Sequence, residues 1–480
     1  MIRKSIHIAA ISILLTLIGC SDSFLDRHPS GPVSSESGNE FIKARVSSAY
    51  AMMYATNIGS SGEDDNFGHL SYLHATEMWG HDIVMYKYNY AWFSFDYKFQ
   101  TRQEIYARMF YPWNFYYKMV FVSNEVIHAI NDNETNQEML DLKGQAYGLR
   151  GFAYHMLAQY YSQTYMINSN NPGTPIYLTP NEPNKGRGTL DNLYSRAEED
   201  LIRSSQMLEN FTRKNKQELD KQIVSGILAR LYLTKGDWSK AAQSARDARN
   251  GWSAMSSEAT QDGFIDASNS SWMWAGLITE ENSTNIASFH GFLSNYGDGG
   301  YGPFQQRCIF SKLYDEIADS DIRKRWFINS RMSNVPDKVK YPAPYANIKF
   351  NIDGNWTEDV PFMRAEEMIL TEAEALVHIG DNQGAATILQ ELMVNRDPSW
   401  NKSSVTLEDV LLQRRIELWG EGFSFFDLKR LQLPMNREGG NHKSDAMFNL
   451  EPNSKYFVYL IPLREIQNNE YINSNDQNEL

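Results

Sequence analysis

Residues 228–248 read LARLYLTKGDWSKAAQSARDA, two apolar segments joined by the turn Gly236-Asp237. Three small residues follow the turn at helical spacing: Ala241, Ala245 and Ala248. Small side chains let two antiparallel helices approach closely, and this spacing is typical of tetratricopeptide repeats. The tryptophan that is usual early in such a repeat is replaced by Ser225. The stretch predicts a helical hairpin.

A second, weaker copy follows further along the chain. Ala373 and Ala385 are twelve residues apart, and Gly380-Asp381 supplies the turn between them. Two such copies predict a mainly α protein with a tetratricopeptide-like helical-pair scaffold, its pairs at about 217–250 and 366–395. The segment 250–360 lies between the two pairs and is rich in Ser, Asn and Gly. This composition predicts a large irregular insertion lobe. That lobe either recognises a ligand or is only a second structural lobe.

Four further segments show helical periodicity: about 40–56, 101–130, 137–161 and 190–208. Pro112 lies within the second segment and is expected to break or restart the helix there, because proline removes a hydrogen bond and clashes with the preceding turn. Three regions follow from this reading: a helical region at 40–249 with an irregular aromatic segment at 67–100 and the first repeat pairs, the insertion at 250–360, and a second helical region at 361–480.

The chain starts with the features of an exported lipoprotein. Arg3 and Lys4 precede an apolar run of 13 residues, Ile6–Ile18, and the motif Leu17-Ile18-Gly19-Cys20 stands at its end. A membrane-spanning helix needs about 20 apolar residues, so the run is the core of a signal peptide. We expect cleavage after residue 19, a lipid on Cys20, and a polar tether over residues 20–39. An ordinary signal peptide with a chance cysteine is the alternative.

Charge and cysteine content exclude several classes of protein. The formal net charge is −14, and it becomes −16 when residues 1–19 are removed. A surface of this sign repels phosphate backbones, so nucleic acid is not an expected partner. The chain has two cysteines, and lipidation of Cys20 would leave Cys308 alone. A single thiol forms neither an intramolecular disulfide nor a multi-cysteine metal site.

Aromatic residues make up 13% of the chain, and many lie outside the periodic segments. Two segments stand out: residues 77–96, and the glycine-rich loop Asn295–Pro303. Aromatic rings in loops commonly hold the flat apolar faces of sugars and also anchor peptides. The alternative is that most of these rings belong to the core. Glycines in the second segment would let its backbone conform to a ligand.

The sequence lacks a strong catalytic motif. It contains no Gly-x-Ser-x-Gly elbow, no His-Glu-x-x-His and no Walker loop. Glu77, His81 and Asp82 are close enough in sequence to ligate a metal, and Glu366-Glu367 could supply the two acids of a glycoside hydrolase. Acidic residues also favour the first turn of a helix, which is where Glu366-Glu367 falls. We therefore expect no enzymatic activity, no cofactor and no metal.

The C-terminal part carries a recognisable string. Residues 413–422 read QRRIELWGEG and continue to FDLKR at 426–430, which resembles the signature ERRxELxxEGxRxxDLxR of the SusD/RagB family. Further matches follow the family order along the chain: Phe24-Leu25-Asp26, LRGFAY at 149–154, ARLYL at 229–233, RAEEMIL at 364–370 with EAEA at 372–375, and IPLREI at 461–466. Gln413 and Ser424 depart from the signature, in what the family uses as scaffold.

The resemblance implies a surface-exposed outer-membrane lipoprotein that binds oligosaccharide and delivers it to a SusC-type TonB-dependent transporter. A peptide-binding lid of the RagB kind on the same class of transporter is the second interpretation, and a surface glycoside hydrolase is the third. The family places its binding aromatics in the two segments named above. The resulting candidate ligand-binding residues, with Asp82 as a polar partner, are Trp79, Asp82, Tyr86, Tyr88, Trp92, Tyr296 and Tyr301.

Overall fold

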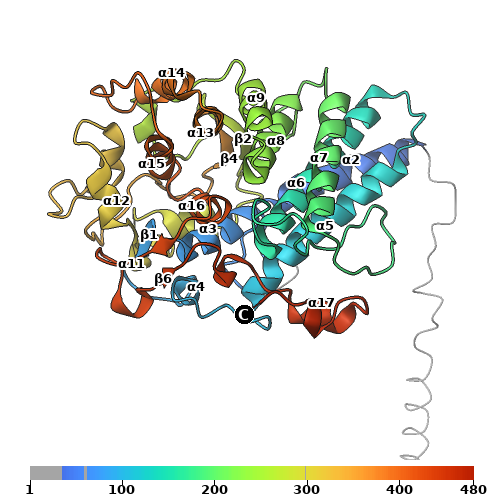
Figure 1. Cartoon of the computed structure of the whole chain (residues 1–480), viewed down its shortest axis with the longest axis horizontal. Coiled ribbons are helices and arrows are strands. Elements are labelled where there is room, and N and C mark those ends of the chain that lie inside the picture. Colours follow the sequence, from blue (N-terminus) through green and yellow to red (C-terminus); the bar gives the residue numbers. More distant parts are fainter. Residues whose placement is uncertain (1–34, 59–61, 298, 480) are drawn as a thin grey trace, which may run out of the picture. The chain divides into compact units, whose positions relative to one another are not determined.

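The structure, a computed structural model, describes residues 35–58, 62–297 and 299–479 (Figure 1). The predicted signal peptide, Cys20 and most of the predicted tether therefore lie outside the described residues. Two units are distinguished, with the boundary between Ala44 and Arg45 inside helix α2 (Ser35–Met52), and every other feature described below lies in the second unit. The predicted organisation of the chain into regions 40–249, 250–360 and 361–480 stays a prediction. No helix in the described part of the chain is long and apolar enough to cross a bilayer.

Helices dominate the fold, which confirms the predicted mainly α class. They are α2 Ser35–Met52, α3 His69–Trp79, α4 Ser94–Tyr97, α5 Ala107–Ala129, α6 Gln137–Tyr161, α7 Leu190–Met207, α8 Lys221–Lys235, α9 Trp238–Ala248, α10 Phe289–Leu293, α11 Gly302–Gln305, α12 Ser311–Glu316, α13 Ala365–His378, α14 Asn382–Met393, α15 Leu407–Glu417, α16 Ser424–Arg430 and α17 Leu463–Asn468. Three antiparallel strand pairs occur among the described residues: β1 Ile83–Met85 with β3 Arg307–Ile309, β2 Trp272–Gly276 with β4 Val360–Arg364, and β5 Met435–Asn436 with β6 Asn449–Leu450.

Both predicted helical pairs are present. In the first, α8 and α9 are joined by Gly236, whose φ of 77° is the left-handed conformation that glycine adopts without strain. Ala241, Ala245 and Ala248 on α9 are fully buried, as expected for residues at a close helix–helix contact. The second pair is α13 and α14, and Gly380 has a φ of 87° in its turn.

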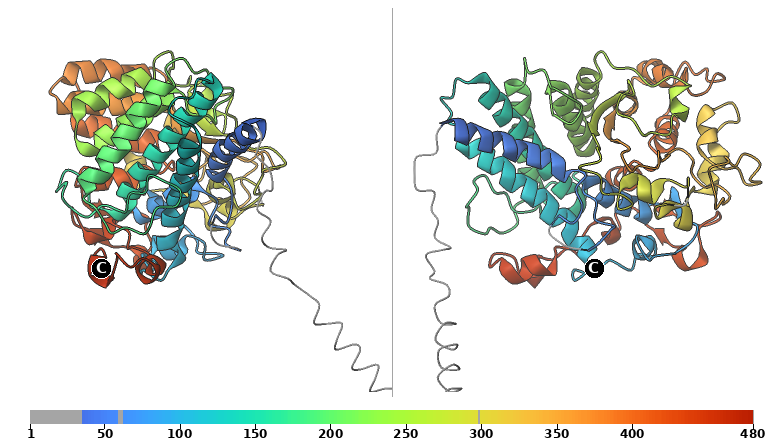
Figure 2. Two further views of the ribbon diagram at one scale, coloured as in Figure 1. Left: turned by 90° about the vertical axis from the view of Figure 1, so that its right-hand side faces the viewer. Right: turned by 180° about the vertical axis from the view of Figure 1, so that it is seen from behind.

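The helical pairs form one continuous stack in space (Figures 1 and 2). Successive helices from α5 to α9 pack against one another, and α9 then packs directly on α13 although the insertion separates them in the sequence. The antiparallel pair β2–β4 joins the two ends of the insertion close to this contact. The insertion thus leaves and re-enters the stack without interrupting it.

The expectation that Pro112 breaks its helix was wrong, because α5 runs through it from Ala107 to Ala129. Pro112 lies in the second turn, where its ring costs one backbone hydrogen bond, and it is buried beside Trp113 and Phe115 in the core. Tertiary packing of a helix face outweighs a single local penalty of this kind. The helix also begins later than predicted, at Ala107, and Thr101 instead donates its hydroxyl to Asp96 Oδ1 at 2.7 Å.

The signature residues form a buried ion network. Glu417 accepts hydrogen bonds from Arg396 at 2.9 and 3.1 Å, and also pairs with Arg323 and Arg364. Burial alone would raise the pKa of Glu417, but the charges and hydrogen bonds of these arginines, Arg396 first, hold it well below its usual range. The predicted role as scaffold fits this geometry. The pairs, however, join distant segments in the core rather than neighbouring turns on a helix surface.

The two departures from the signature belong to the same buried chemistry. The amide oxygen of Gln413 accepts a hydrogen bond from Arg323 Nη2. The hydroxyl of Ser424 donates to Asp82 Oδ2 at 2.8 Å, and its backbone N–H donates to Glu77 Oε1 at 2.9 Å. Both side chains are therefore hydrogen-bonded members of the scaffold.

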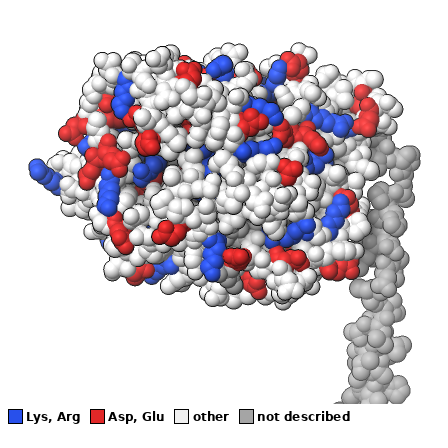
Figure 3. Space-filling model, in the orientation of Figure 1, with Lys and Arg blue, Asp and Glu red and all other residues white. Residues whose placement is uncertain are grey.

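Charged side chains of both signs are mixed on the face drawn in Figure 3. Among the described residues on that face, no large basic patch stands out. Intermingled charges of this kind leave that face without a strong field of one sign.

Candidate functional site

The structure brings the two predicted aromatic segments together. Strand β1 pairs with β3, so that Val84 lies opposite Cys308. The pairing extends past the strand ends, where the backbone N–H groups of Tyr86 and Lys87 donate to Gln306 and Gln305 at 3.0 and 2.9 Å. Residues more than 200 positions apart in the sequence thereby form one surface.

Aromatic side chains cover this surface in a connected group, which we call the aromatic platform: Tyr90, Trp92, Tyr301, Phe304 and Tyr341. The ring of Tyr301 lies at its centre, edge-on to Tyr90 at 5.3 Å and to Trp92 at 6.3 Å between ring centroids. Phe304 contacts Tyr90 at 5.9 Å and Tyr341 at 5.2 Å. Tyr90 is 57% exposed and Tyr341 41%, so the platform faces solvent.

The centre of the platform is fixed from below and from one side. Tyr301 stacks on buried Phe292, with ring centroids 4.6 Å apart, and its hydroxyl donates to Asp64 Oδ2. Burial, together with the neighbouring Asp64, raises the pKa of Tyr301 to about 12. The hydroxyl therefore stays protonated at neutral pH and keeps the ring in one orientation.

The loop that displays Tyr90 and Trp92 has a strained backbone. Tyr90, Ala91 and Phe93 have φ values of 69°, 63° and 58°, in the left-handed region that ordinary residues avoid. Hydrogen bonds across the strand pair hold this conformation, for example from Asn89 Nδ2 to Phe304 O at 3.0 Å. Left-handed residues of this kind cluster at ligand sites, where they are held by the surrounding structure.

Trp356, from the other end of the insertion, lies against the glycine-rich loop. A Cβ atom on Gly299 would lie 2.8 Å from the Trp356 ring, and one on Gly300 would lie 3.0 Å away. These glycines therefore serve a close approach of backbone to indole. Trp356 itself has a φ of 61°, and Ser283 Oγ donates to its carbonyl oxygen at 2.6 Å.

Two of the predicted site residues point into the core and are left out of the proposed site. Trp79 is 0% exposed, because it packs on Tyr459 at 4.5 Å between ring centroids and beneath the guanidinium of Arg102. Asp82 is buried as well, and it accepts hydrogen bonds from Arg415 Nη2 at 2.6 Å and from Ser424. A ring and a carboxylate so enclosed cannot reach a ligand in this conformation.

Three other predicted residues lie near the surface with different surroundings. Tyr86 is 42% exposed beside the platform. The hydroxyl of Tyr88 donates to Asp445 at 2.7 Å, and its ring lies 4.1 Å from Lys98 Nζ and 4.3 Å from Lys443 Nζ. Tyr296 is half-buried, and its hydroxyl lies 3.4 Å from Ile348 O. Tyr88 and Tyr296 are thus engaged by the protein itself.

A buried arginine supports the segment that leads into the platform. Arg437 is fully buried, and its guanidinium donates to four main-chain carbonyls, those of Met78, Gly80, Tyr97 and Ala446, at 2.6–2.9 Å. Three of these carbonyls flank residues 81–96. The guanidinium therefore ties both ends of the predicted aromatic segment to the C-terminal region.

The structure offers no support for the metal and catalytic alternatives raised by the sequence. Within the described ranges, no three His, Cys, Asp or Glu side chains are grouped to hold a metal ion. Glu367 pairs with Arg230 at 2.6 and 2.7 Å, and Glu366 pairs with Arg364 and Arg396 at 2.9 and 3.1 Å. Carboxylates so neutralised are unsuited to acid and nucleophile roles.

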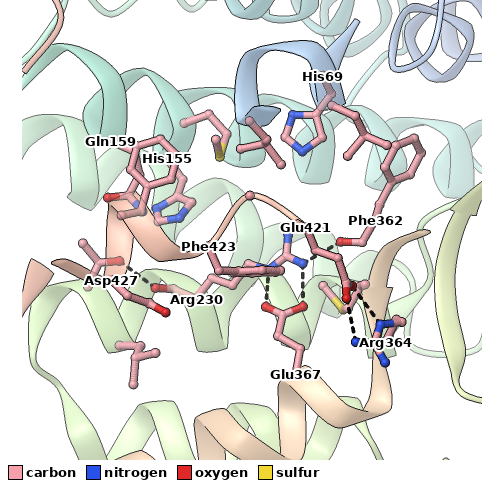
Figure 4. A pocket seen from close by; sticks show the side chains of 18 of the residues that line it. His69, His155, Gln159, Arg230, Phe362, Arg364, Glu367, Glu421, Phe423 and Asp427 are labelled. Carbon is pink, nitrogen blue, oxygen red and sulfur yellow. Dashed lines mark hydrogen bonds and ion pairs between the residues drawn. The ribbon is translucent and has the colours of Figure 1, made fainter. Parts of the chain in front are cut away.

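A cavity of about 60 Å³ lies inside the helical stack, between α3, α6, α8, α13 and α16 (Figure 4). Charged groups at its wall are paired with one another: Arg230 with Glu367, and Arg364 with Glu421. The two histidines that line it, His69 and His155, have pKa values lowered to about 3 by burial and are therefore neutral. We assign this cavity to the scaffold.

Two protein-family models match the chain. One, described as starch-binding and associating with the outer membrane, matches residues 24–233, and the model of the SusD family matches residues 336–477. The chain belongs to the SusD/RagB family.

Known proteins resemble the chain over nearly its whole length. A SusD-like protein P2 of Formosa agariphila is 23% identical and aligns over 96% of each chain. A SusD-like carbohydrate binding protein of Bacteroides vulgatus has a crystal structure with a TM-score of 0.80 and 25% identity, covering 92% of this chain and 98% of that one. The surface glycan-binding protein A of Bacteroides thetaiotaomicron, solved with laminarihexaose, has a TM-score of 0.71 and 16% identity, covering 92% and 99%.

Proposed function

We propose that this protein is a surface-exposed outer-membrane lipoprotein that binds an oligosaccharide on the aromatic platform and delivers it to a SusC-type TonB-dependent transporter. The observation that carries the proposal is the platform itself, with solvent-facing rings held by a strained loop and a buried Tyr301. The family membership and the glycan-binding relatives support the same conclusion.

The chemistry of the platform suits a sugar chain. The faces of pyranose rings carry C–H groups that pack on aromatic rings, and Tyr90, Trp92 and Tyr341 offer such faces at the surface. Asn89 and Asp64 supply polar groups at the edge, where sugar hydroxyls would lie.

Anchoring and delivery are parts of the same proposal. Cys20 would carry the lipid, and mass spectrometry of the membrane-extracted protein should find an acylated N-terminal cysteine. A Cys20→Ala variant should be released from membranes, and an unmodified Cys20 in the membrane fraction would contradict the anchor. Co-purification with a TonB-dependent transporter from the native host tests the delivery step.

The ligand class is tested by isothermal titration calorimetry on residues 21–480. The probes are laminarihexaose, cellohexaose, maltohexaose, xylohexaose and mannohexaose, and a pool of hexapeptides. Binding of one or more glycans, lost in a Tyr90→Ala, Trp92→Ala double variant, is the expected result. Binding of peptides alone would favour the RagB-type lid. Release of reducing sugar during prolonged incubation would favour the hydrolase.

A further inference from the structure

A second aromatic groove, which shares no residue with the platform, lies along α5. Its volume is about 350 Å³, and its other walls are residues 177–184 and α17. Phe110, Asn114, Tyr117 and Phe121 are spaced four, three and four residues apart, so they form one stripe along the helix. Tyr177 faces this stripe from the opposite wall, edge-on to Tyr117 with 5.8 Å between ring centroids.

The stripe reaches solvent along a helix that is otherwise largely buried. Phe121 is 43% exposed, and Phe110, Tyr117 and Tyr177 are half-buried. Trp113 lies behind Tyr117, with 4.8 Å between ring centroids, and closes the floor of the groove. The groove is therefore concave and aromatic, and its volume is within the range of small-ligand sites.

Two polar side chains of the lining, Asn114 and Glu465, each keep one acceptor oxygen that no described donor uses. Asn114 Nδ2 donates a hydrogen bond to Ile58 O at 3.2 Å, and Glu465 Oε1 accepts one from Asn469 Nδ2 at 2.7 Å. Among the contacts between described residues, Asn114 Oδ1 and Glu465 Oε2 have no donor. Acceptors placed beside aromatic faces match the hydroxyl groups of a sugar.

The charges of the groove are balanced. Glu182 forms an ion pair with Lys185, and its other oxygen accepts from the backbone N–H of Leu178. Arg464 lies 4.8 Å from the ring centroid of Phe110, on the same short helix as Glu465. The two carboxylates of the lining thus have cations in their neighbourhood, and the groove has no lysine or arginine in its lining to attract an anionic ligand.

We propose that this groove is a second saccharide site, which holds one or two pyranose rings of a neutral glycan on the faces of Phe110 and Phe121. Two sites on one chain would let the protein hold a long polysaccharide at two points at once. The combined affinity then exceeds that of either site alone, provided that the glycan spans the distance between them.

The test places a fluorine reporter in the groove. A 4-trifluoromethylphenylalanine replaces Phe121, and its ¹⁹F resonance is followed while laminaritriose, cellotriose, mannotriose, xylotriose and trigalacturonic acid are added. The local reporter makes the result independent of binding at the platform. We expect a saturable shift with at least one neutral trisaccharide and none with the acidic trisaccharide.

Three variants of the reporter protein complete the experiment. Thr179→Trp adds bulk at an exposed wall position without removing core packing, and it should abolish the shift. Phe110→Ala should weaken the binding about 3- to 10-fold, the loss expected for one aromatic contact. The platform variant Tyr90→Ala, Trp92→Ala should leave the shift unchanged.

Each contrary result overturns the proposal. These are the absence of a shift with every neutral trisaccharide, a shift that persists in Thr179→Trp, and a shift that disappears in the platform variant. If calorimetry finds no glycan binding that depends on the platform but the ¹⁹F shift of the groove reporter is still seen, only the proposed function is contradicted.

Discussion

Arg415 on α15 and Asp82, just before β1, form a bidentate ion pair across 333 positions of the sequence, with Nη2–Oδ1 at 2.6 Å and Nε–Oδ2 at 3.2 Å. Trp419 strengthens the link, since its indole N–H donates to the Asp82 carbonyl oxygen at 2.9 Å. The signature helix of the family thus holds the strand that carries the aromatic platform.

Removing Arg415 should destabilise the fold and loosen the platform. In Arg415→Ala, the carboxylate of Asp82 stays buried without its cation, and we expect a loss of about 2–3 kcal/mol in the free energy of unfolding. This is less than for a fully buried pair, because the Arg415 side chain is 27% exposed. Urea unfolding measures it. The matched control is Lys402→Ala, which breaks an exposed pair with Asp409 and should cost less than about 1 kcal/mol. Equal losses in both variants would contradict the structural role of Arg415.

Acid should weaken this link through Asp82. Burial raises the pKa of Asp82, but Arg415 and then His81 outweigh burial and lower it from 3.8 to about 2. A depressed pKa stabilises the fold above the ordinary value, and the contribution is lost as the pH falls through about 2. The difference in unfolding free energy between wild type and Asp82→Asn should therefore be largest above pH 4 and shrink toward pH 2. A difference independent of pH would refute it.

Glu77 should change the stability of the fold with pH in the opposite direction to Asp82. Burial, with the nearby Asp82, raises the pKa of Glu77 from 4.5 to about 8, so the folded protein holds a proton there that the unfolded chain releases. Its contribution to stability is complete below pH 4.5 and is lost as the pH rises through about 8. Glu77→Gln should flatten the stability profile between pH 5 and 9 in thermal unfolding experiments. An unchanged slope would show that Glu77 ionises normally.

Single platform rings should contribute modestly to ligand affinity. Trp92→Ala or Tyr90→Ala should weaken binding of the glycan found by calorimetry about two- to tenfold, because one aromatic contact is worth about 0.5–1.5 kcal/mol. Tyr471→Ala, which removes a ring that is 55% exposed elsewhere, is the control and should leave affinity unchanged. Affinity that survives removal of Tyr90, Trp92 and Tyr341 together would exclude the platform as the site.

A large residue at the closest helix contact should strain the scaffold. Ala241 on α9 is fully buried, so Ala241→Leu should destabilise the protein by about 1–3 kcal/mol through overpacking. Gln243→Leu introduces the same side chain at an exposed position of the same helix and should have little effect. Thermal unfolding of both variants separates packing from helix propensity. Equal stability of the two would contradict the close contact.

The scaffold could be predicted from the sequence because its signals are local. Alanines at helical spacing and a Gly-Asp turn are sufficient to indicate a pair of packed helices, and α8–α9 and α13–α14 follow that pattern. Pro112 misled the prediction because its penalty is local, whereas the packing that overrides it comes from other helices.

The site could be predicted only by segment. The segments of Trp92 and Tyr301 were expected to hold the ligand together. The structure places these two rings side by side, and ligand binding by them stays a prediction. The choice of residue failed for Trp79, because α3 is buried on all sides and its sequence has no polar stripe to mark an inner face. Tyr90, Phe304 and Tyr341 were missed, since their contacts depend on the register of β1 with β3.

The continuous packing of α9 on α13 bears on how relatives could exchange binding specificity. Because the ends of the insertion meet at β2–β4, a recombined gene could replace it with a segment of another length while the helices on either side keep their contacts. Arg323 and Lys349 restrict such exchanges, since both lie in the insertion and neutralise Glu417 and Glu421 of the scaffold. A transplanted insertion would have to bring cations at these two positions, or Glu417 and Glu421 would keep only Arg364 and Arg396 as cationic partners in the core.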